Sequence, residues 1–251
     1  MKKIIALIFF FSIVITGQAL AKDINFNEGL TQVDFNDLSK EAVALLSYKN
    51  MAPAAPLGIT GFDIGLESSF VSISTGKNNY WEKAFEGDAP SMLAAPRLRV
   101  RKGLPMGIDL GAMYSTLPGS NIKLYGGELS YAILEGSVAT PALGVRGTFT
   151  KLTGVEDLDY STTGIDISIS KGFVIVTPYG GAGMVYFNSK AKGDLQTLST
   201  ALNGTPLSNE KKWQPRYFAG LKISPAPLFG ITAEMEYLNR PVYSLKVALS
   251  F

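Results

Sequence analysis

The clearest pattern in the chain is the alternation of apolar and polar positions over its C-terminal end. From Tyr243 to Phe251, every odd-numbered residue is large and apolar or aromatic, and every even-numbered residue is small or polar. A period of two is typical of a β-strand whose two faces meet different surroundings. A soluble sheet with one wet face could contain such a strand, but the last residues of a soluble domain are usually frayed. The alternation therefore favours a transmembrane barrel strand, with one face on lipid and the other on the lumen.

Earlier runs show the same alternation once Phe251 is placed on the lipid face. Their lipid-facing sides are represented by Ile64, Leu98, Leu110, Leu129, Val145, Ile167, Leu221 and Met235, and in one further run by Tyr179, Val185 and Phe187. With the final strand, this makes about ten segments of near transmembrane length. We therefore expect an all-β fold, a closed antiparallel up-and-down transmembrane β-barrel over residues 57–251. Eight or twelve strands also satisfy the pattern.

The lengths of the connections test this interpretation independently, because such barrels have short periplasmic turns and longer outer loops. With both termini in the periplasm, the turns fall at 103–105, 135–138, 171–173 and 225–228. The outer connections then fall at 76–90, 117–121, 153–159, 190–211 and 239–241. The two longest connections lie on the same side, as the barrel requires.

The N-terminal end has the features of a secretory signal peptide. Lys2 and Lys3 precede an apolar run over residues 4–16, and a small-x-small cleavage site ends at Ala21. An anchoring helix is the alternative reading, but the run is shorter than the roughly 20 residues that span a bilayer. We therefore expect residues 1–21 to be removed on export.

The C-terminal strand resembles the signal strand of Gram-negative outer-membrane β-barrel proteins, in which the assembly machinery reads a terminal Phe. The resemblance implies that Tyr243, Leu245, Val247, Leu249 and Phe251 form the assembly signal. It also implies that the protein lies in the outer membrane, with the membrane lipids and the barrel-assembly machinery as partners. The likeness is to the small porin-like class and identifies no specific family.

Residues 22–56 precede the barrel and are expected in the periplasm. Asn36 or Asp37 could cap a helix running from about Leu38 to Tyr48, and two prolines in residues 51–56 would end it. The simpler interpretation is a short helix packed under the barrel rim. The alternative is a plug that enters the lumen, by analogy with the N-terminal hatch of long-chain fatty-acid transporters, although no motif of that family is visible.

Composition narrows the possible chemistry. The chain has 23 basic and 21 acidic residues, and these balance once Lys2 and Lys3 are removed. This balance gives no sign of a nucleic-acid partner. There is no Cys and no His, so a thiolate site and the commonest general base are both missing. We expect no enzyme activity, no cofactor and no metal site, and we expect a monomer.

The lumen face collects charged residues of both signs in nearly equal number. These candidate lumen-lining residues are Asp63, Glu67, Arg97, Arg99, Arg101, Asp109, Glu128, Arg146, Asp166, Arg216, Lys222, Glu234, Glu236 and Lys246. A lone buried charge costs several kcal/mol, so these groups must pair or stay hydrated. One hypothesis is a structural salt-bridge lattice that fills the lumen. The other is a narrow polar pathway in which Arg97, Arg99 and Arg101 face an acidic wall and select small charged or zwitterionic solutes.

Two outer connections are expected to have order of their own. Asp194 could cap a helix that Gly204 stops. The other connection contains Tyr80, Trp81 and Phe85, with Met92 close behind. These residues could form an aromatic patch at the lipid boundary or recognise a surface ligand.

Two functions follow from this sequence. The first is a narrow channel or carrier for small or hydrophobic solutes, because a barrel of about ten strands is far narrower than an open porin. The alternative is a structural or surface-recognition barrel, an adhesin or receptor, whose lumen is filled and transports nothing.

Overall fold

The structure is a computed structural model that describes residues 24, 26, 28–74, 76, 79–85, 89–116 and 122–251. The predicted signal peptide and the 117–121 connection lie outside these residues, as does part of the 76–90 connection. None of the helices in the described part of the chain is long and apolar enough to cross a bilayer.

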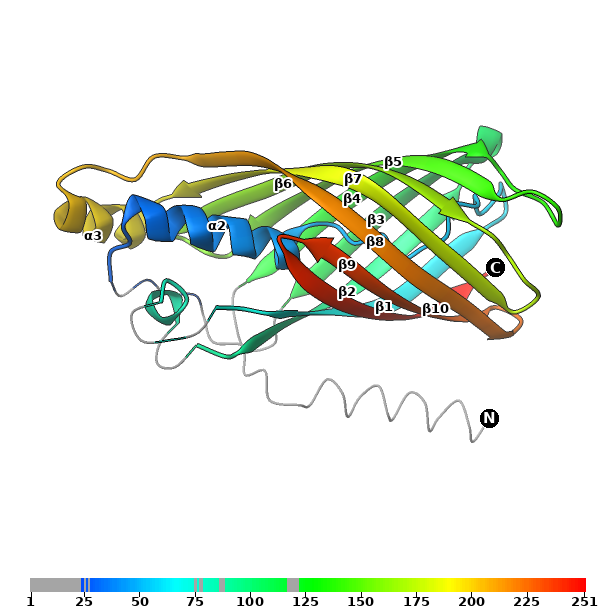
Figure 1. The fold of residues 1–251 in the computed structure, drawn as a ribbon, viewed down its shortest axis with the longest axis horizontal. Coiled ribbons are helices and arrows are strands. Elements are labelled where there is room, and N and C mark those ends of the chain that lie inside the picture. The colour runs from blue at the N-terminus through cyan, green and yellow to red at the C-terminus, as the bar shows by residue number, and fades with distance from the viewer. Residues whose placement is uncertain are drawn as a thin grey trace.

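Ten antiparallel strands form one closed barrel, in which each strand pairs with the next and the first pairs with the last (Figure 1). The strands are β1 (Phe62–Ser72), β2 (Met92–Gly103), β3 (Ile108–Thr116), β4 (Lys123–Leu134), β5 (Ala142–Thr153), β6 (Leu158–Ser170), β7 (Val176–Ala191), β8 (Glu210–Ala226), β9 (Phe229–Leu238) and β10 (Arg240–Ser250). The predicted fold and its ten strands are confirmed. The barrel begins at Phe62 rather than at residue 57.

The connections divide between the two ends of the barrel as predicted. Residues 104–107, 135–141, 171–175 and 227–228 form one end, here called the short-turn end. The opposite, long-loop end holds the connections 73–91 and 192–209 and the shorter ones that follow β3, β5 and β9. The 192–209 connection contains helix α3 (Gly193–Asn203), and the 73–91 connection contains the short 3-10 helix η1 (Glu82–Ala84).

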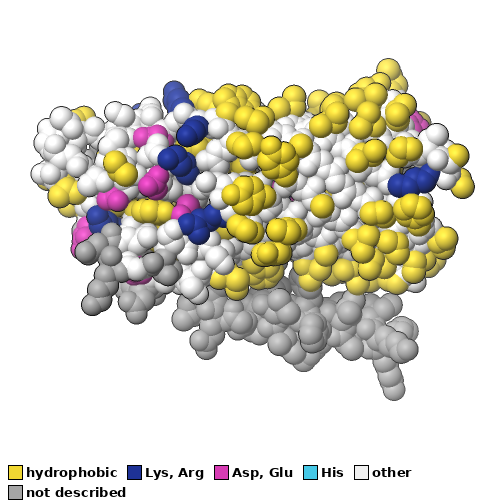
Figure 2. All heavy atoms as spheres, viewed as in Figure 1, with side chains coloured by type: hydrophobic (Ala, Val, Ile, Leu, Met, Phe, Trp, Pro, Cys, Tyr) yellow, Lys and Arg dark blue, Asp and Glu magenta, His cyan; other side chains and the backbone are white. Residues whose placement is uncertain are grey.

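The outer surface is apolar and the lumen face is charged, as the alternation predicts. Ile167 on β6 and Met235 on β9 are about half exposed, whereas Asp166 and Glu236 beside them are buried. Figure 2 shows hydrophobic side chains spread over the barrel wall, with charged side chains gathered toward the long-loop end. A closed barrel with this surface has the form of an outer-membrane β-barrel.

The predicted phase of β7 is wrong. Tyr179, Val185 and Phe187 face the lumen and are buried, while Met184 faces outward. Gly183 also faces inward, where a Cβ would lie 2.2 Å from Asp166 Oδ1. The prediction assumed that apolar residues always face lipid, but the long-loop half of this lumen is itself apolar.

That apolar lumen surrounds helix α2 (Gln32–Leu46), which lies inside the barrel. Ser39 shows the enclosure, because its Oγ is 2.8 Å from Ser189 Oγ on β7 and its carbonyl oxygen accepts a hydrogen bond from Tyr160 on β6. Buried residues from many strands pack around the helix: Val71, Met113, Leu124, Leu152, Tyr160, Val185, Phe187, Leu238 and Val242. The prediction of a helix under the rim is therefore wrong, and the alternative, a plug in the lumen, describes the structure.

The bounds of α2 also differ from the prediction. Thr31 is the N-cap, and its side chain accepts a hydrogen bond from the Asp34 backbone while the Asp34 side chain accepts one from the Thr31 backbone. This reciprocal pair is a capping box, and it starts the helix at Gln32, six residues before the predicted start at Leu38. Buried residues are spread around the helix, including Phe35, Ser39 and Glu41, as expected when a wall encloses it on every side.

The described residues between 24 and 61 thread the barrel from one end to the other, and we call them the N-terminal segment. Ile24 forms an isolated β-bridge with Phe85 in a long-loop connection, whereas Phe251 pairs with Phe62 at the short-turn end. The expectation that both ends of the chain lie on the periplasmic side is therefore wrong for the described N-terminal residues. The predicted division of the connections between the two ends of the barrel does not change, because β1 still starts at the short-turn end.

Candidate functional site: the charged lumen and the segment inside it

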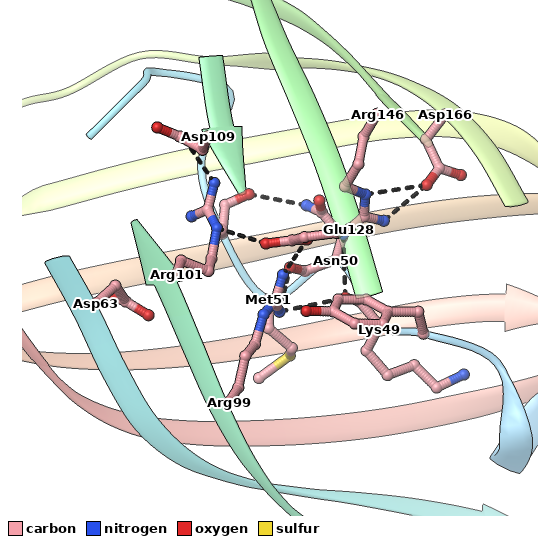
Figure 3. A network of polar contacts seen from close by, with 12 residues as sticks. Lys49, Asn50, Met51, Asp63, Arg99, Arg101, Asp109, Glu128, Arg146 and Asp166 are labelled. Atoms are coloured by element: carbon pink, nitrogen blue, oxygen red, sulfur yellow. Dashed lines mark hydrogen bonds and ion pairs between the residues drawn. The ribbon is translucent and has the colours of Figure 1, made fainter. Parts of the chain in front are cut away.

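The predicted lumen-lining residues all face the interior. All of them are buried except Lys222, which is half-buried near the short-turn mouth. Most of them form ion pairs with residues of nearby strands, and Figure 3 shows part of this network. Whether they line a conducting pathway is a separate question, because most of them do not contact an open space.

Glu128 is the centre of one ion-pair cluster. Its carboxylate lies 2.6 Å from Arg99 Nη2, 2.6 Å from Arg101 Nε and 3.6 Å from Arg146 Nη1. Arg101 also pairs with Asp109 at 2.9 Å. These contacts join β2, β3, β4 and β5, so arginines of β2 pair with carboxylates of strands close to it in the same wall.

Asp166 is the centre of the second cluster. It accepts hydrogen bonds from Arg146 at 2.7 Å and from Arg216, which lies across β7 on β8. The inward glycine at position 183 leaves the space through which Arg216 reaches this carboxylate. The two clusters share Arg146 and therefore form one lattice.

The arginines of this lattice also hold the main chain of the N-terminal segment. Arg216 donates to the Tyr48 carbonyl at 2.7 Å, Arg99 to that of Asn50 at 2.6 Å, and Arg146 to that of Lys49 at 3.0 Å. Arg97 donates to the Leu45 carbonyl. The last carbonyls of a helix have no partner within it and carry partial negative charge, so this arginine cage caps the end of α2 and the extended chain after it.

Strand carboxylates hold the backbone N–H groups of the same segment. Met51 N donates to Glu234 at 2.9 Å, and Leu57 N donates to Asp109 at 3.0 Å. Tyr179 also donates to Glu234, at 2.8 Å. The walls therefore present cations to carbonyl groups and carboxylates to N–H groups, which fixes both the position and the direction of the segment.

Two residues of the segment belong to the site although the sequence did not indicate them. Lys49 is fully buried and pairs with Glu236 at 2.5 Å. The Tyr48 ring lies under the Arg99 guanidinium, 4.8 Å from ring centroid to Cζ, a distance at which cation–π attraction operates. A buried wall charge needs a partner, but nothing in the local sequence shows that a preceding segment supplies it.

Glu41 of α2 fastens the long-loop end to the helix. Its carboxylate accepts hydrogen bonds from Ser74 Oγ at 2.7 Å, Tyr80 Oη at 2.5 Å and Trp81 Nε1 at 2.7 Å, and it pairs with Arg240. Trp81 and Phe85 are buried. The aromatic residues of this loop therefore pack on α2 instead of forming a patch at the lipid boundary, and only Met92 is widely exposed.

Glu41 and the groups that bind its carboxylate are here called the Glu41 latch. These contacts shift the pKa values of Glu41 and Tyr80. Burial raises the pKa of Glu41, but the hydrogen bonds from Tyr80, Ser74 and Trp81 outweigh it and hold the pKa below the ordinary value. Burial, together with the hydrogen bond to Glu41, raises the pKa of Tyr80 to about 12. The latch is thus built around an ionised carboxylate.

Helix α3 also closes the long-loop end of the barrel, where it binds the N-terminal segment. Leu30 N donates to Ser199 Oγ at 2.9 Å, and Asn203 donates to the Leu30 carbonyl at 2.8 Å. The helix was predicted, and Gly204 ends it in the left-handed conformation. The predicted cap is wrong, because Asp194 N is bound instead by the carboxylate of Asp157 from the neighbouring connection.

The described residues leave open space at the short-turn end of the lumen. A cavity of about 390 Å³ opens at the short-turn mouth, with Asp63, Arg101, Lys222 and Lys246 among its lining residues. Above it, Arg99, Arg216 and Lys49 have no exposed surface, so the lattice and the segment fill the barrel at that level. The described residues contain no cluster of side chains suited to a metal ion.

The proposed assembly-signal residues lie on the outer face of β10. Tyr243, Leu249 and Phe251 are more than half exposed, and Leu245 and Val247 share their face. The Phe251 ring stacks on Phe62 with centroids 5.5 Å apart, which closes the barrel seam. Recognition of this strand by assembly machinery stays a prediction.

Comparison with known proteins gives structural similarity only. No protein-family model and no curated protein matches the chain. Among solved structures, the chain is similar to Ail of Yersinia pestis in complex with the heparin analogue sucrose octasulfate, at 15% identity and a TM-score of 0.33 over 76% of this chain and 99% of that chain. It is also similar to the KdgM porin (11%, TM-score 0.35, 76% and 99%) and to the outer membrane protein OprG from Pseudomonas aeruginosa (9%, TM-score 0.36, 80% and 99%). At such values the assignment of the fold rests on this chain's own strand pairing.

Removing one cage residue should destabilise the barrel strongly. We expect Arg216→Met to lower the free energy of unfolding by about 3–5 kcal/mol, because it leaves Asp166 with one partner fewer and the Tyr48 carbonyl without the arginine that binds it. Urea unfolding in lipid vesicles, followed by the gel shift of heated against unheated samples, measures the change. The matched control Lys222→Met removes a half-buried cation that forms no ion pair in the described structure, and should change stability by about 0.5 kcal/mol or less. Equal losses in the two variants would contradict the cage.

Acidification should release the Glu41 latch. Since the pKa of folded Glu41 lies below its ordinary value of 4.5, the latch contributes its full stability above pH 4.5 and loses it as the pH falls through the lower, folded value. In a Trp213→Phe background, the emission of Trp81 should shift to the red at pH below 4.5. The Glu41→Gln variant should show no such step. A step of the same size in both proteins would assign the transition to another group.

Proposed function

We propose that the protein is a closed barrel of the Gram-negative outer membrane and that its own N-terminal segment fills the lumen. In this proposal it works as a structural or surface-recognition protein. The observation that supports this proposal most directly is the arginine cage. Four wall arginines donate to carbonyl groups of residues 45–50. These arginines therefore bind the main chain of the protein itself and not a solute.

The long-loop end offers the recognition surface in this proposal. The N-terminal segment, the 73–91 connection and α3 are joined there by hydrogen bonds to Glu41, Ser199 and Asn203. Loops held in one conformation lose little entropy when they bind a partner. Leu198 and Leu202 stand one turn apart on the exposed face of α3 and give this surface an apolar contact point.

A narrow gated channel is the second candidate function. The half of the segment beyond α2 is held by many hydrogen bonds and ion pairs, and water can take the place of such polar contacts when the segment moves. The 390 Å³ cavity already brings solvent to the foot of the lattice. Displacement of residues 47–57 would extend this cavity as far as the end of α2, and a continuous pathway for small solutes would also require α2 to leave the apolar half of the lumen.

Electrical recording separates the two candidates. We expect the refolded wild-type protein to show no conductance in a planar bilayer, because fully buried side chains and main chain fill the lumen at the level of Arg99. Steady openings in the wild type would overturn the closed-barrel proposal.

An Arg97→Ala variant, which frees the Leu45 carbonyl, extends the same recording. A silent variant agrees with a structural barrel, whereas bursts seen in this variant and absent in Lys222→Ala would favour the gated channel. Both variants must first show the heat-dependent gel shift of a folded barrel. The monomeric state and the lack of a cofactor or a nucleic-acid partner are further proposals.

A further inference from the structure

The outer face of the barrel changes character sharply on one side, near the long-loop end. The strand register aligns Lys151 of β5 with Ser161 of β6, Ser161 with Asn188 of β7, and Asn188 with Lys211 of β8. Register partners share a face, and this row points away from the lumen because the buried residues of these strands occupy the alternate positions. Four neighbouring strands therefore carry one polar row with a lysine at each end.

The row two residues nearer the barrel centre is aromatic. It aligns Phe149 with Thr163, Thr163 with Tyr186, and Tyr186 with Trp213. Phe149 and Trp213 are about half exposed, and the rings of Tyr186 and Trp213 lie 5.3 Å apart. Aromatic residues of this kind mark the level where the hydrocarbon of a bilayer meets the lipid headgroups.

On each of these strands the residue of the polar row lies on the long-loop side of the aromatic row. Two residues along a strand correspond to about 7 Å, so the lysines of the polar row lie that far beyond the aromatic rings. Ile165 and Met184, one row further in, are apolar and exposed. Figure 2 shows basic side chains at the edge of the hydrophobic belt on the long-loop side.

One carboxylate on this surface, that of Asp159, forms ion pairs with two of its lysines. Asp159 on β6 binds Lys192 at 2.7 Å and also binds Lys151, and Lys190 is its register partner on β7. Glu156, Asp157 and Asp194 lie in the two adjoining connections. Lys190 and Lys211 form no ion pair with any described residue.

We infer that Lys151, Lys190, Lys192 and Lys211, with Ser161 and Asn188 between them, bind the phosphate groups of a phosphorylated glycolipid in the outer leaflet. Lysine ammonium groups form charge-assisted hydrogen bonds with phosphate oxygens, and the hydroxyl and amide groups supply further donors. The aromatic row below would lie against the first part of the acyl chains. We call the site formed by these six residues the lysine row. Its proposed role depends on the proposed outer-membrane location of the protein and on neither of the two candidate functions of the lumen.

Two adjacent residues provide a matched test. Lys211 and Lys212 are both exposed on β8, but Lys212 is aligned with the buried Phe187 and so lies on the lumen side of the wall. The refolded full chain in phosphatidylcholine nanodiscs would be titrated with bisphosphorylated lipid A, and bound lipid counted by native mass spectrometry. We expect K211Q to weaken binding by about five-fold, the K151Q/K190Q/K211Q variant by about a hundred-fold, and K212Q not at all.

Several outcomes would overturn the lysine row. Equal binding by K211Q and K212Q would show that position on the wall does not matter, and unchanged binding by the triple variant would exclude these side chains. Equal affinity of the wild type for lipid A from which the phosphates have been removed would exclude phosphate recognition. Failure of the wild type to insert into any lipid would count against the membrane location itself, whereas insertion without preference counts against the lysine row alone.

Discussion

The need to satisfy every charged and polar group inside a closed wall shapes this structure. A ten-stranded barrel encloses a narrow lumen, and buried ions there must find partners. The wall carries acidic and basic side chains in nearly equal number, yet pairing between them does not use all their hydrogen-bonding capacity. The N-terminal segment supplies further partners, with carbonyl groups for Arg97, Arg99, Arg146 and Arg216 and N–H groups for Glu234 and Asp109.

This dependence is mutual. The carbonyl groups at the end of α2 would be unpaired in an apolar lumen, and an isolated helix of this length is only marginally stable in water. The apolar half of the lumen buries Phe35, Leu38 and Val43, while the arginine cage binds the helix end. Barrel and segment therefore complete each other, and the segment is better regarded as the core of the barrel than as an accessory domain.

The barrel could be predicted from the sequence, but the segment that fills its lumen could not. A period of two fixes which residues of β1 and β10 face lipid, because a shift of one residue would expose Lys246 or Glu67 to hydrocarbon. The same rule failed for β7, since Phe187 and Val185 face an apolar partner inside the lumen. The role of Lys49 was equally invisible, because its partner Glu236 lies 187 residues away. Long-range partners of a threaded segment leave no local pattern.

The account is tested most directly by crosslinking α2 to the inner wall. The chain contains no cysteine, and the hydroxyl oxygens of Ser39 and Ser189 are 2.8 Å apart, so a Ser39→Cys/Ser189→Cys variant should form a disulfide in the folded protein, detected by mass spectrometry of the joined peptides. Ser69 and Ser244, equally close on β1 and β10, give a positive control within the wall when both are changed to cysteine. A disulfide in both variants is the predicted result. A disulfide in the control alone, with both thiols of the helix-to-wall variant open to a water-soluble maleimide, would show that the helix lies outside the lumen.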